Sequence, residues 1–133
     1  MSSKQNQKQQ QQQQRERLEA ETMEFQQLQK EYSGLVGSRQ QLESQLQENE
    51  VVEKELKHLK RSDPSARVYK MVGPVLVLQD SAEAGANVDK RIEFIRGEMA
   101  RVEKRIEQLA RDQEKKSVAI FKLQMDMQGV SQA

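Results

Sequence analysis

The side chains that most often carry catalysis or bind a metal are scarce in this sequence. The chain has no cysteine and a single histidine, His58, so it offers neither a thiolate nor a pair of imidazoles. None of its six glycines is followed by lysine, which excludes a P-loop. The many carboxylates alternate with lysine and arginine, as they do on solvated helix faces. We therefore expect no enzyme activity, no metal and no cofactor.

The composition argues against a conventional globular core. Among 133 residues, 32% are charged and 4% are aromatic, so the apolar surface must be buried in narrow seams. The formal net charge is only +1 with both signs interspersed, which favours neither nucleic acid nor an anionic membrane as a partner. The longest apolar run, at residues 75–78, is too short to cross a bilayer, and the N-terminus lacks an apolar signal-peptide segment. We expect a cytoplasmic protein that binds other proteins.

The first half of the chain predicts a polar tail followed by a coiled-coil helix. Residues 1–14 are rich in lysine and glutamine and are expected to be disordered. Residues 15–62 form a heptad pattern that Asp63 and Pro64 should terminate, with Gly34 and Gly37 as its weakest stretch. The apolar seam positions are Leu18, Phe25, Leu28, Tyr32, Leu35, Leu42, Leu46 and Leu56, and the polar interruptions are Glu21, Arg39, Asn49 and Glu53.

The second half predicts a longer and more regular helix over residues 81–130. Either Ser81 or Asn87 could cap its N-terminus. Its seam advances in steps of three and four residues, and Gln113 and Lys116 are the polar interruptions. The apolar members are Val88, Ile92, Ile95, Met99, Val102, Ile106, Leu109, Ile120, Leu123, Met127 and Val130.

Between the helices, residues 67–79 have the composition of a β-hairpin. Apolar and β-branched residues lie on both sides of Gly73 and Pro74, a pair suited to a tight turn. Such a turn reverses the chain, so the two helices should pair antiparallel. A pairing centred on Pro74 places Leu28 against Ile120 and Tyr32 against Lys116. A slip of one heptad, which would place Leu28 against Gln113, remains open at this stage.

A lone two-stranded hairpin is marginal in water, and its edges leave backbone groups unpaired. Both strands are apolar on both faces, which favours pairing with hairpins of other subunits in a closed barrel. The alternative is that the hairpin packs on the bases of its own helices, where Val52, Leu59 and Phe94 are available. The expected oligomer interface consists of Val68, Tyr69, Met71, Val72, Val75, Leu76, Val77 and Leu78.

The ends of the helices that lie farthest from the hairpin in sequence carry apolar residues outside the seam. A contiguous apolar patch on a solvated helix indicates an interaction site, and methionine adapts well to irregular partners. The alternatives are packing on a neighbouring subunit or a frayed end. The expected binding tip consists of Leu18, Met23, Phe25, Val118, Phe121, Met125, Met127 and Val130.

Three segments resemble the β-type subunits of prefoldin: ENEVVEKEL at 48–56, VYKMVGPVLVLQD at 68–80 and NVDKRIEFI at 87–95. The stretches LQKEYS at 28–33 and SRQQLESQL at 38–46 add to the likeness, which covers about residues 15–130. The resemblance implies a mainly α-helical fold, an antiparallel coiled coil joined by one β-hairpin that contributes to an oligomeric β-barrel.

The resemblance also implies a function. Such subunits assemble as two α-type and four β-type chains, hold unfolded actin and tubulin at the coil tips without ATP, and deliver them to the cytosolic chaperonin. The polyglutamine segment departs from the family pattern. The main alternative is a structural coiled-coil adaptor that tethers specific partners; a parallel homodimeric coil fits poorly with a central hairpin, and an enzyme accessory subunit has little support.

Overall fold

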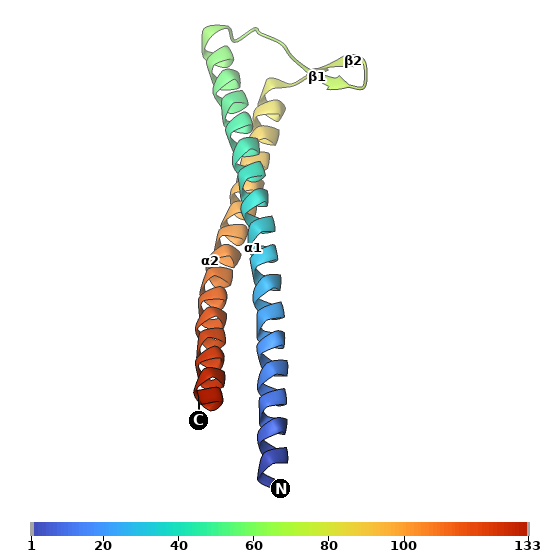
Figure 1. Ribbon diagram of the computed structural model, residues 1–133. Coiled ribbons are helices and arrows are strands. Elements are labelled where there is room, and N and C mark those ends of the chain that lie inside the picture. The colour runs from blue at the N-terminus through green and yellow to red at the C-terminus, as the bar shows by residue number, and fades with distance from the viewer. Residues whose placement is uncertain (1, 133) are drawn as a thin grey trace. The chain divides into compact units, whose positions relative to one another are not determined.

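The computed structural model describes the backbone of residues 2–132 and the side chains of residues 2–129. Its elements follow the order α1 (Ser2–Ser62), β1 (Val68–Val72), β2 (Val75–Gln79) and α2 (Ser81–Gln132), as Figure 1 shows. Two long helices therefore flank a single β-hairpin, as the sequence predicts. The helices form an antiparallel coiled coil.

Helix α1 extends further toward the N-terminus than expected. It begins at Ser2, so residues 2–14, for which the sequence predicts a disordered tail, are helical. Glutamine and lysine are good helix formers, and adding residues to an existing helix avoids the cost of nucleation. No glycine or proline interrupts this stretch. Residues 2–13 are nonetheless exposed, so intrinsic propensity alone supports the first turns.

Helix α1 ends where the sequence predicts. The Asp63 amide still donates to the Leu59 carbonyl at 2.9 Å, and Pro64 follows. The Asp63 carboxylate then accepts hydrogen bonds from the Ser65 amide at 3.1 Å and the Ser65 hydroxyl at 2.6 Å. The Ala66 amide bonds to the Asp63 carbonyl at 3.0 Å, which closes a β-turn. This turn carries the chain from α1 toward the hairpin.

The two strands of the hairpin are joined by a two-residue turn, the shortest common type of hairpin connection. Strands β1 and β2 pair antiparallel, with Val72 opposite Val75 and Val68 opposite Gln79. Only Gly73 and Pro74 lie between the strands, and Gly73 has a φ of 60°. A positive φ at the first loop residue and a negative φ at the second define a type II′ turn, which glycine followed by proline fits without strain.

The start of α2 corrects the predicted cap. The helix begins at Ser81, and the Asp80 carboxylate accepts a hydrogen bond from the Ala82 amide at 3.3 Å. The Ala84 amide donates to the Asp80 carbonyl at 2.9 Å, the first turn of the helix. Asp80 is thus the N-cap, and the prediction of Ser81 or Asn87 is wrong. Aspartate satisfies the free amides, and its charge suits the helix N-terminus.

The chain divides into two compact units. The hairpin unit comprises residues 37–103, and the terminal unit comprises the residues up to Val36 together with those from Lys104. The boundary in α1 falls between Val36 and Gly37, within the stretch that the two helix glycines make weakest.

The predicted seams are confirmed in both units. Every predicted seam position of α1 from Leu18 to Leu56 is half-buried, including the four polar interruptions. In α2 every described seam position from Val88 to Met127 is buried or half-buried, and Leu109 is fully buried. Ala84, one turn before Val88, adds a buried position that the sequence analysis omits.

The predicted pairing of the seams is wrong by one heptad. In the terminal unit Lys116 contacts Glu21 and Glu24. The partner predicted for Lys116, Tyr32, lies two to three turns further along α1. Arg105 likewise donates to Glu31 at 2.9 Å. These contacts set Leu28 opposite Gln113, the alternative that the sequence left open.

The hairpin unit has the same register. Arg96 contacts Glu50 at 3.3 Å, and Arg39 contacts Glu103 at 3.1 Å. The register differs from the predicted one because the two connections between helices and hairpin are unequal in length. Residues 63–67 separate α1 from β1, whereas Asp80 alone separates β2 from α2. The pairing is therefore centred before Pro74, not on it.

Candidate protein-binding surfaces

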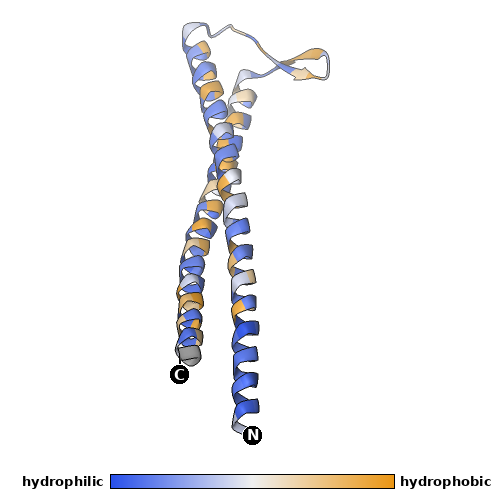
Figure 2. Ribbon diagram, viewed as in Figure 1, coloured by the Kyte–Doolittle hydropathy of each residue, from blue (hydrophilic) through white to orange (hydrophobic). Residues whose placement is uncertain are grey.

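The hairpin exposes nearly all of the apolar side chains that the sequence assigns to an oligomer interface. Of that set only Val68 is half-buried, and the other members are between 47% and 71% exposed. The strand pairing sorts them onto two faces. One face also carries Lys70 and Gln79, whereas the other is wholly apolar and consists of Tyr69, Met71, Leu76 and Leu78. Figure 2 shows the hairpin as a mostly hydrophobic element.

The hairpin's own helices do not cover these faces. Phe94, which the sequence analysis considers as a cover, is itself 65% exposed, and Val52 and Leu59 are exposed too. The described sheet has two strands, so each strand has one edge without a strand neighbour. Within residues 2–129, the alternative in which the hairpin packs on its own helices therefore finds no support in burial.

The terminal unit carries a second exposed apolar surface on α2. Val118, Phe121 and Met125, called here the outer stripe, are 50%, 62% and 51% exposed. Their spacing of three and four residues aligns them on one helix face. Ile120 and Leu123 lie on the opposite side of the helix, where they are half-buried and buried in the seam.

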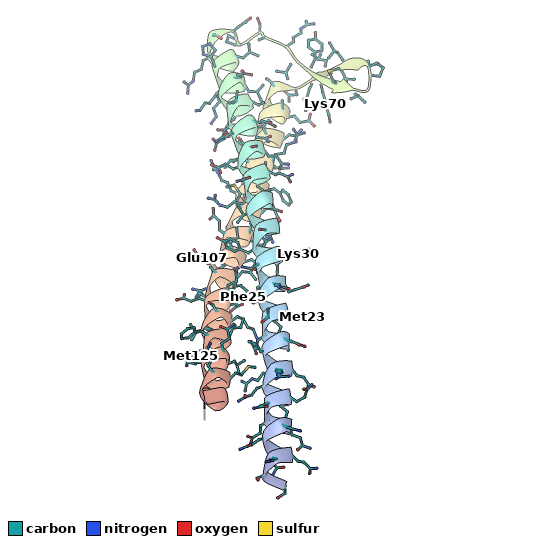
Figure 3. All side chains as sticks on the ribbon, in the orientation of Figure 1. Met23, Phe25, Lys30, Lys70, Glu107 and Met125 are labelled. Atoms are coloured by element: carbon teal, nitrogen blue, oxygen red, sulfur yellow. The ribbon has the colours of Figure 1, made fainter. Side chains whose placement is uncertain are left out.

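The other residues predicted for the binding tip divide between seam and surface. Leu18, Phe25 and Met127 are half-buried in the seam, so they support the coil and expose little area. Met23 is 69% exposed on the outer face of α1. In Figure 3 Met23 and Met125 lie on opposite sides of the helix pair, with Phe25 between the helices. The side chain of Val130 lies outside the described residues.

A charged cluster interrupts the seam of the terminal unit. The Lys116 ammonium donates to Glu21 at 2.8 Å and also to Glu24, and its side chain is only 28% exposed. The hydrogen bond to Glu21, followed by that to Glu24, raises the pKa of Lys116 above its usual 10.5. From the sequence, Lys116 is predicted only as a polar interruption of the seam. A lysine at a seam position opposite two acids three residues apart is the signal that could have identified this cluster.

Neither a metal-ligating cluster nor a membrane-spanning helix is found among the described residues. No group of three or more histidine, cysteine, aspartate or glutamate side chains is placed to hold a metal. None of the described helices combines the length and apolar character needed to cross a bilayer.

The fold and these surfaces define a coiled-coil subunit with an uncovered β-hairpin. The chain belongs to the prefoldin family, because the family model described as "Prefoldin subunit" matches residues 19–127. It is a prefoldin chaperone subunit, and the family supports its assembly with other prefoldin subunits.

Comparisons with individual proteins agree. The chain is 41% identical over 111 residues to "Prefoldin subunit 6" of Homo sapiens, covering 84% of each chain. It is 43% identical over 99 residues to "Prefoldin subunit 6" of Saccharomyces cerevisiae, covering 74% of this chain and 84% of that one. The prefoldin beta subunit from Thermococcus strain KS-1 has the same fold, with a TM-score of 0.71 and 21% identity, covering 78% of this chain and 89% of that one.

Proposed function

We propose that this chain is one of six subunits, two α-type and four β-type, whose hairpins close into a double β-barrel. The support is the hairpin itself, which has two free edges and apolar faces that its own helices leave exposed. Strands from neighbouring subunits would pair with the edges and bury the faces. Within this proposal the hairpin serves assembly and the helices serve binding.

The assembled protein holds unfolded polypeptides at the ends of its coils. The outer stripe offers apolar contact, and methionine accommodates irregular partners. Each contact is weak, so several subunits acting on one client give a useful affinity through effective concentration. Release then requires no nucleotide. Unfolded actin and tubulin are the clients, and the cytosolic chaperonin receives them in the cytoplasm.

One observation carries this proposal. The outer stripe remains more than half exposed at Phe121 although the seam beneath it is closed, with Leu123 only 9% exposed. The coil thus has no need of these side chains for its own packing. A solvated helix that keeps three large apolar residues outside its seam has them available for another chain.

The test replaces Val118, Phe121 and Met125 together by serine. The variant should assemble with its partner subunits, as native mass spectrometry would show, but suppress the aggregation of chemically unfolded actin far less well. Val51→Ser is a matched control, because Val51 is 54% exposed on α1 outside both surfaces. Unchanged suppression by the triple variant would contradict the proposal.

The adaptor alternative is tested by competition. An unrelated unfolded protein, such as reduced and carboxymethylated lactalbumin, should displace a bound client from a holdase, because both use non-specific apolar contact. A specific adaptor would keep its partner under the same conditions. Retention of the client at a large excess of competitor would therefore favour the adaptor.

A further inference from the structure

The base of the coil in the hairpin unit carries three large apolar residues outside its seam. Val52, Leu59 and Phe94, called here the base surface, are 42%, 37% and 65% exposed. Val52 and Leu59 are seven residues apart, so they lie in one row along α1. The seam beside them is already closed, because Ile92 and Ile95 are buried. The coil therefore does not need the base surface for its own packing.

Two adjoining depressions show that these residues share one side of the helix pair. The first has a volume of about 410 Å³, and Phe94 and Gln45 are among the residues that line it. Gln45 precedes Val52 by seven residues, so it belongs to the row of Val52 and Leu59. The second has a volume of about 220 Å³ and is lined in part by Val52. Arg91 lines both depressions, so they adjoin each other.

The other side of the same helix pair is polar. Arg96 pairs with Glu50 between the helices there, at 3.3 Å. Asp89 and Lys57, which lie one heptad from Arg96 and Glu50, line a third depression of about 310 Å³. None of the large apolar residues that are exposed in the described part of the chain lines this depression. The two sides of the coil base therefore differ, one with an ion pair and one with apolar side chains.

The base surface is continuous with the hairpin. The depression beside Val52 is also lined by Val68, Tyr69 and Lys70, three consecutive residues of β1. Side chains alternate between the two faces of a strand, so this depression borders the outer edge of β1 and not one face alone. A strand added to that edge would lie beside the base of the helices.

The charges beside the base surface are mixed. Lys90 and Arg91 are exposed on α2, and Glu48 and Glu55 are exposed on α1 within about one turn of Val52. Net charge therefore does not select an occupant. The apolar side chains and the adjoining strand edge do.

We propose that the base surface binds the hairpin of the neighbouring prefoldin subunit whose strand pairs with the outer edge of β1. The inference rests on the proposed assembly and adds a helix contact to its strand contact. Apolar side chains of the neighbour pack on Val52, Leu59 and Phe94 while its backbone bonds to β1. Only one side of the coil base is apolar, so the neighbour beside β2 is held by the strand alone. The two neighbours are therefore held unequally.

The test places the photoreactive residue benzoylphenylalanine at position 94 of the full-length chain in its assembled complex. Irradiation should join this subunit to one neighbour only, through a residue of that neighbour's hairpin, as mass spectrometry of the cross-linked peptides would show. The same residue at position 89, on the polar side of α2, should give no such product. Cross-links from position 94 to neither neighbour, or equally to both, would overturn the inference.

A double variant, Val52→Ser with Phe94→Ser, gives an independent measurement. It should raise the concentration at which half of the complexes dissociate by about tenfold or more, because the assembly loses two buried apolar side chains. Val51→Ser is the matched control, because Val51 is 54% exposed on a different face of α1 and lines neither depression. The same dissociation for the double variant and the wild type would refute the helix contact.

Further outcomes separate the inference from the function beneath it. If lysines on the apolar face of the hairpin abolished assembly but the double serine variant left it unchanged, the inference would fail and the proposed assembly would stand. If the hairpin variant also assembled normally, the proposed function would fail and the inference with it. If position 94 captured chemically unfolded actin added to the complex, the base surface would bind clients and the inference would be wrong.

Discussion

The hairpin and the outer stripe expose apolar side chains to a similar extent, but their backbones differ. Leu76 in the hairpin is 63% exposed and Phe121 in the stripe is 62% exposed. The stripe lies on a helix whose backbone hydrogen bonds are internal, so only side chains are available to a partner. In the hairpin, the outer edge of each strand has amides and carbonyls that can pair with a neighbouring strand.

This difference indicates which surface is suited to lasting contact. Strand addition joins directional backbone bonds to apolar burial and fixes the register of the partner, as a permanent assembly requires. A helix face with three apolar residues imposes little geometry and releases its partner easily. Equal exposure can therefore correspond to a structural interface in one part of the chain and a transient one in the other.

The largest effect is expected from charges on the apolar face of the hairpin. Leu76→Lys with Leu78→Lys should abolish assembly, because two ammonium groups would be buried without partners. Val75→Lys with Val77→Lys should weaken assembly less, since that face already carries Lys70 opposite Val77. Native mass spectrometry measures both. Equal stability of the two variants in the complex would show that assembly does not bury the wholly apolar face more deeply than the face with Lys70.

A change of seam register should follow from loss of the Lys116 charge. Lys116→Gln leaves the half-buried Glu21 and its exposed neighbour Glu24 without their shared cation, which weakens the observed pairing and favours the one that places Leu28 against Ile120. The chain has no cysteine, so pairs introduced at 28 and 113, or at 28 and 120, report the register by disulfide formation.

In the wild-type background the 28 and 113 pair should form the disulfide, and Lys116→Gln should raise the share trapped through 28 and 120. Lys115→Gln is the matched control, because Lys115 is exposed and unpaired within the described residues. Efficient trapping of 28 with 120 in the wild type would show that the ion pairs do not set the register.

Most of the architecture could be predicted from local sequence patterns. Heptad spacing predicts the seam positions from Leu18 to Leu56 and from Val88 to Met127, and Gly73 with Pro74 predicts the turn, because each depends on residues close together in sequence. The exposure of the outer stripe also followed from spacing, since residues outside the seam of a two-helix coil have no cover.

The register could not be predicted in this way. It depends on the reach of two connections, and the composition of residues 63–67 does not reveal how Asp63 and Ser65 fold the chain. The register also depends on ion pairs between the helices, such as Arg105 with Glu31. The spacing of apolar residues does not reveal these pairs. Residues 2–14 lack the apolar side chains that a packed seam requires, which predicts disorder, but the helix propensity of glutamine and lysine is sufficient to extend α1 through them.

Alanine substitutions at two glycines should change stability in opposite directions. Gly73→Ala should destabilise the hairpin by about 1–2 kcal/mol, because alanine is strained at a φ of 60°. An added Cβ would meet no atom within 4 Å, so backbone conformation is the whole effect. Chemical denaturation of the assembled complex measures the loss. An unchanged midpoint would imply that the turn adopts another conformation in the assembly.

Gly37→Ala should act in the other direction. Gly37 lies inside α1, and a Cβ there would likewise meet no atom within 4 Å. Alanine should therefore stabilise the helix by about 1 kcal/mol, which thermal unfolding of the full-length chain would show as a higher midpoint. A decrease would mean that the boundary between the two units requires glycine at this position.

The smallest effect is expected from pH. The pKa of Lys116 is raised in the folded chain, so its stabilising contribution is complete below its usual value of 10.5 and is lost as pH rises through the folded value. The difference in unfolding midpoint between wild type and Lys116→Gln should thus stay constant from pH 7 to about pH 10 and shrink above it. A difference that began to fall near neutral pH would show that Lys116 is not held charged by its two acids.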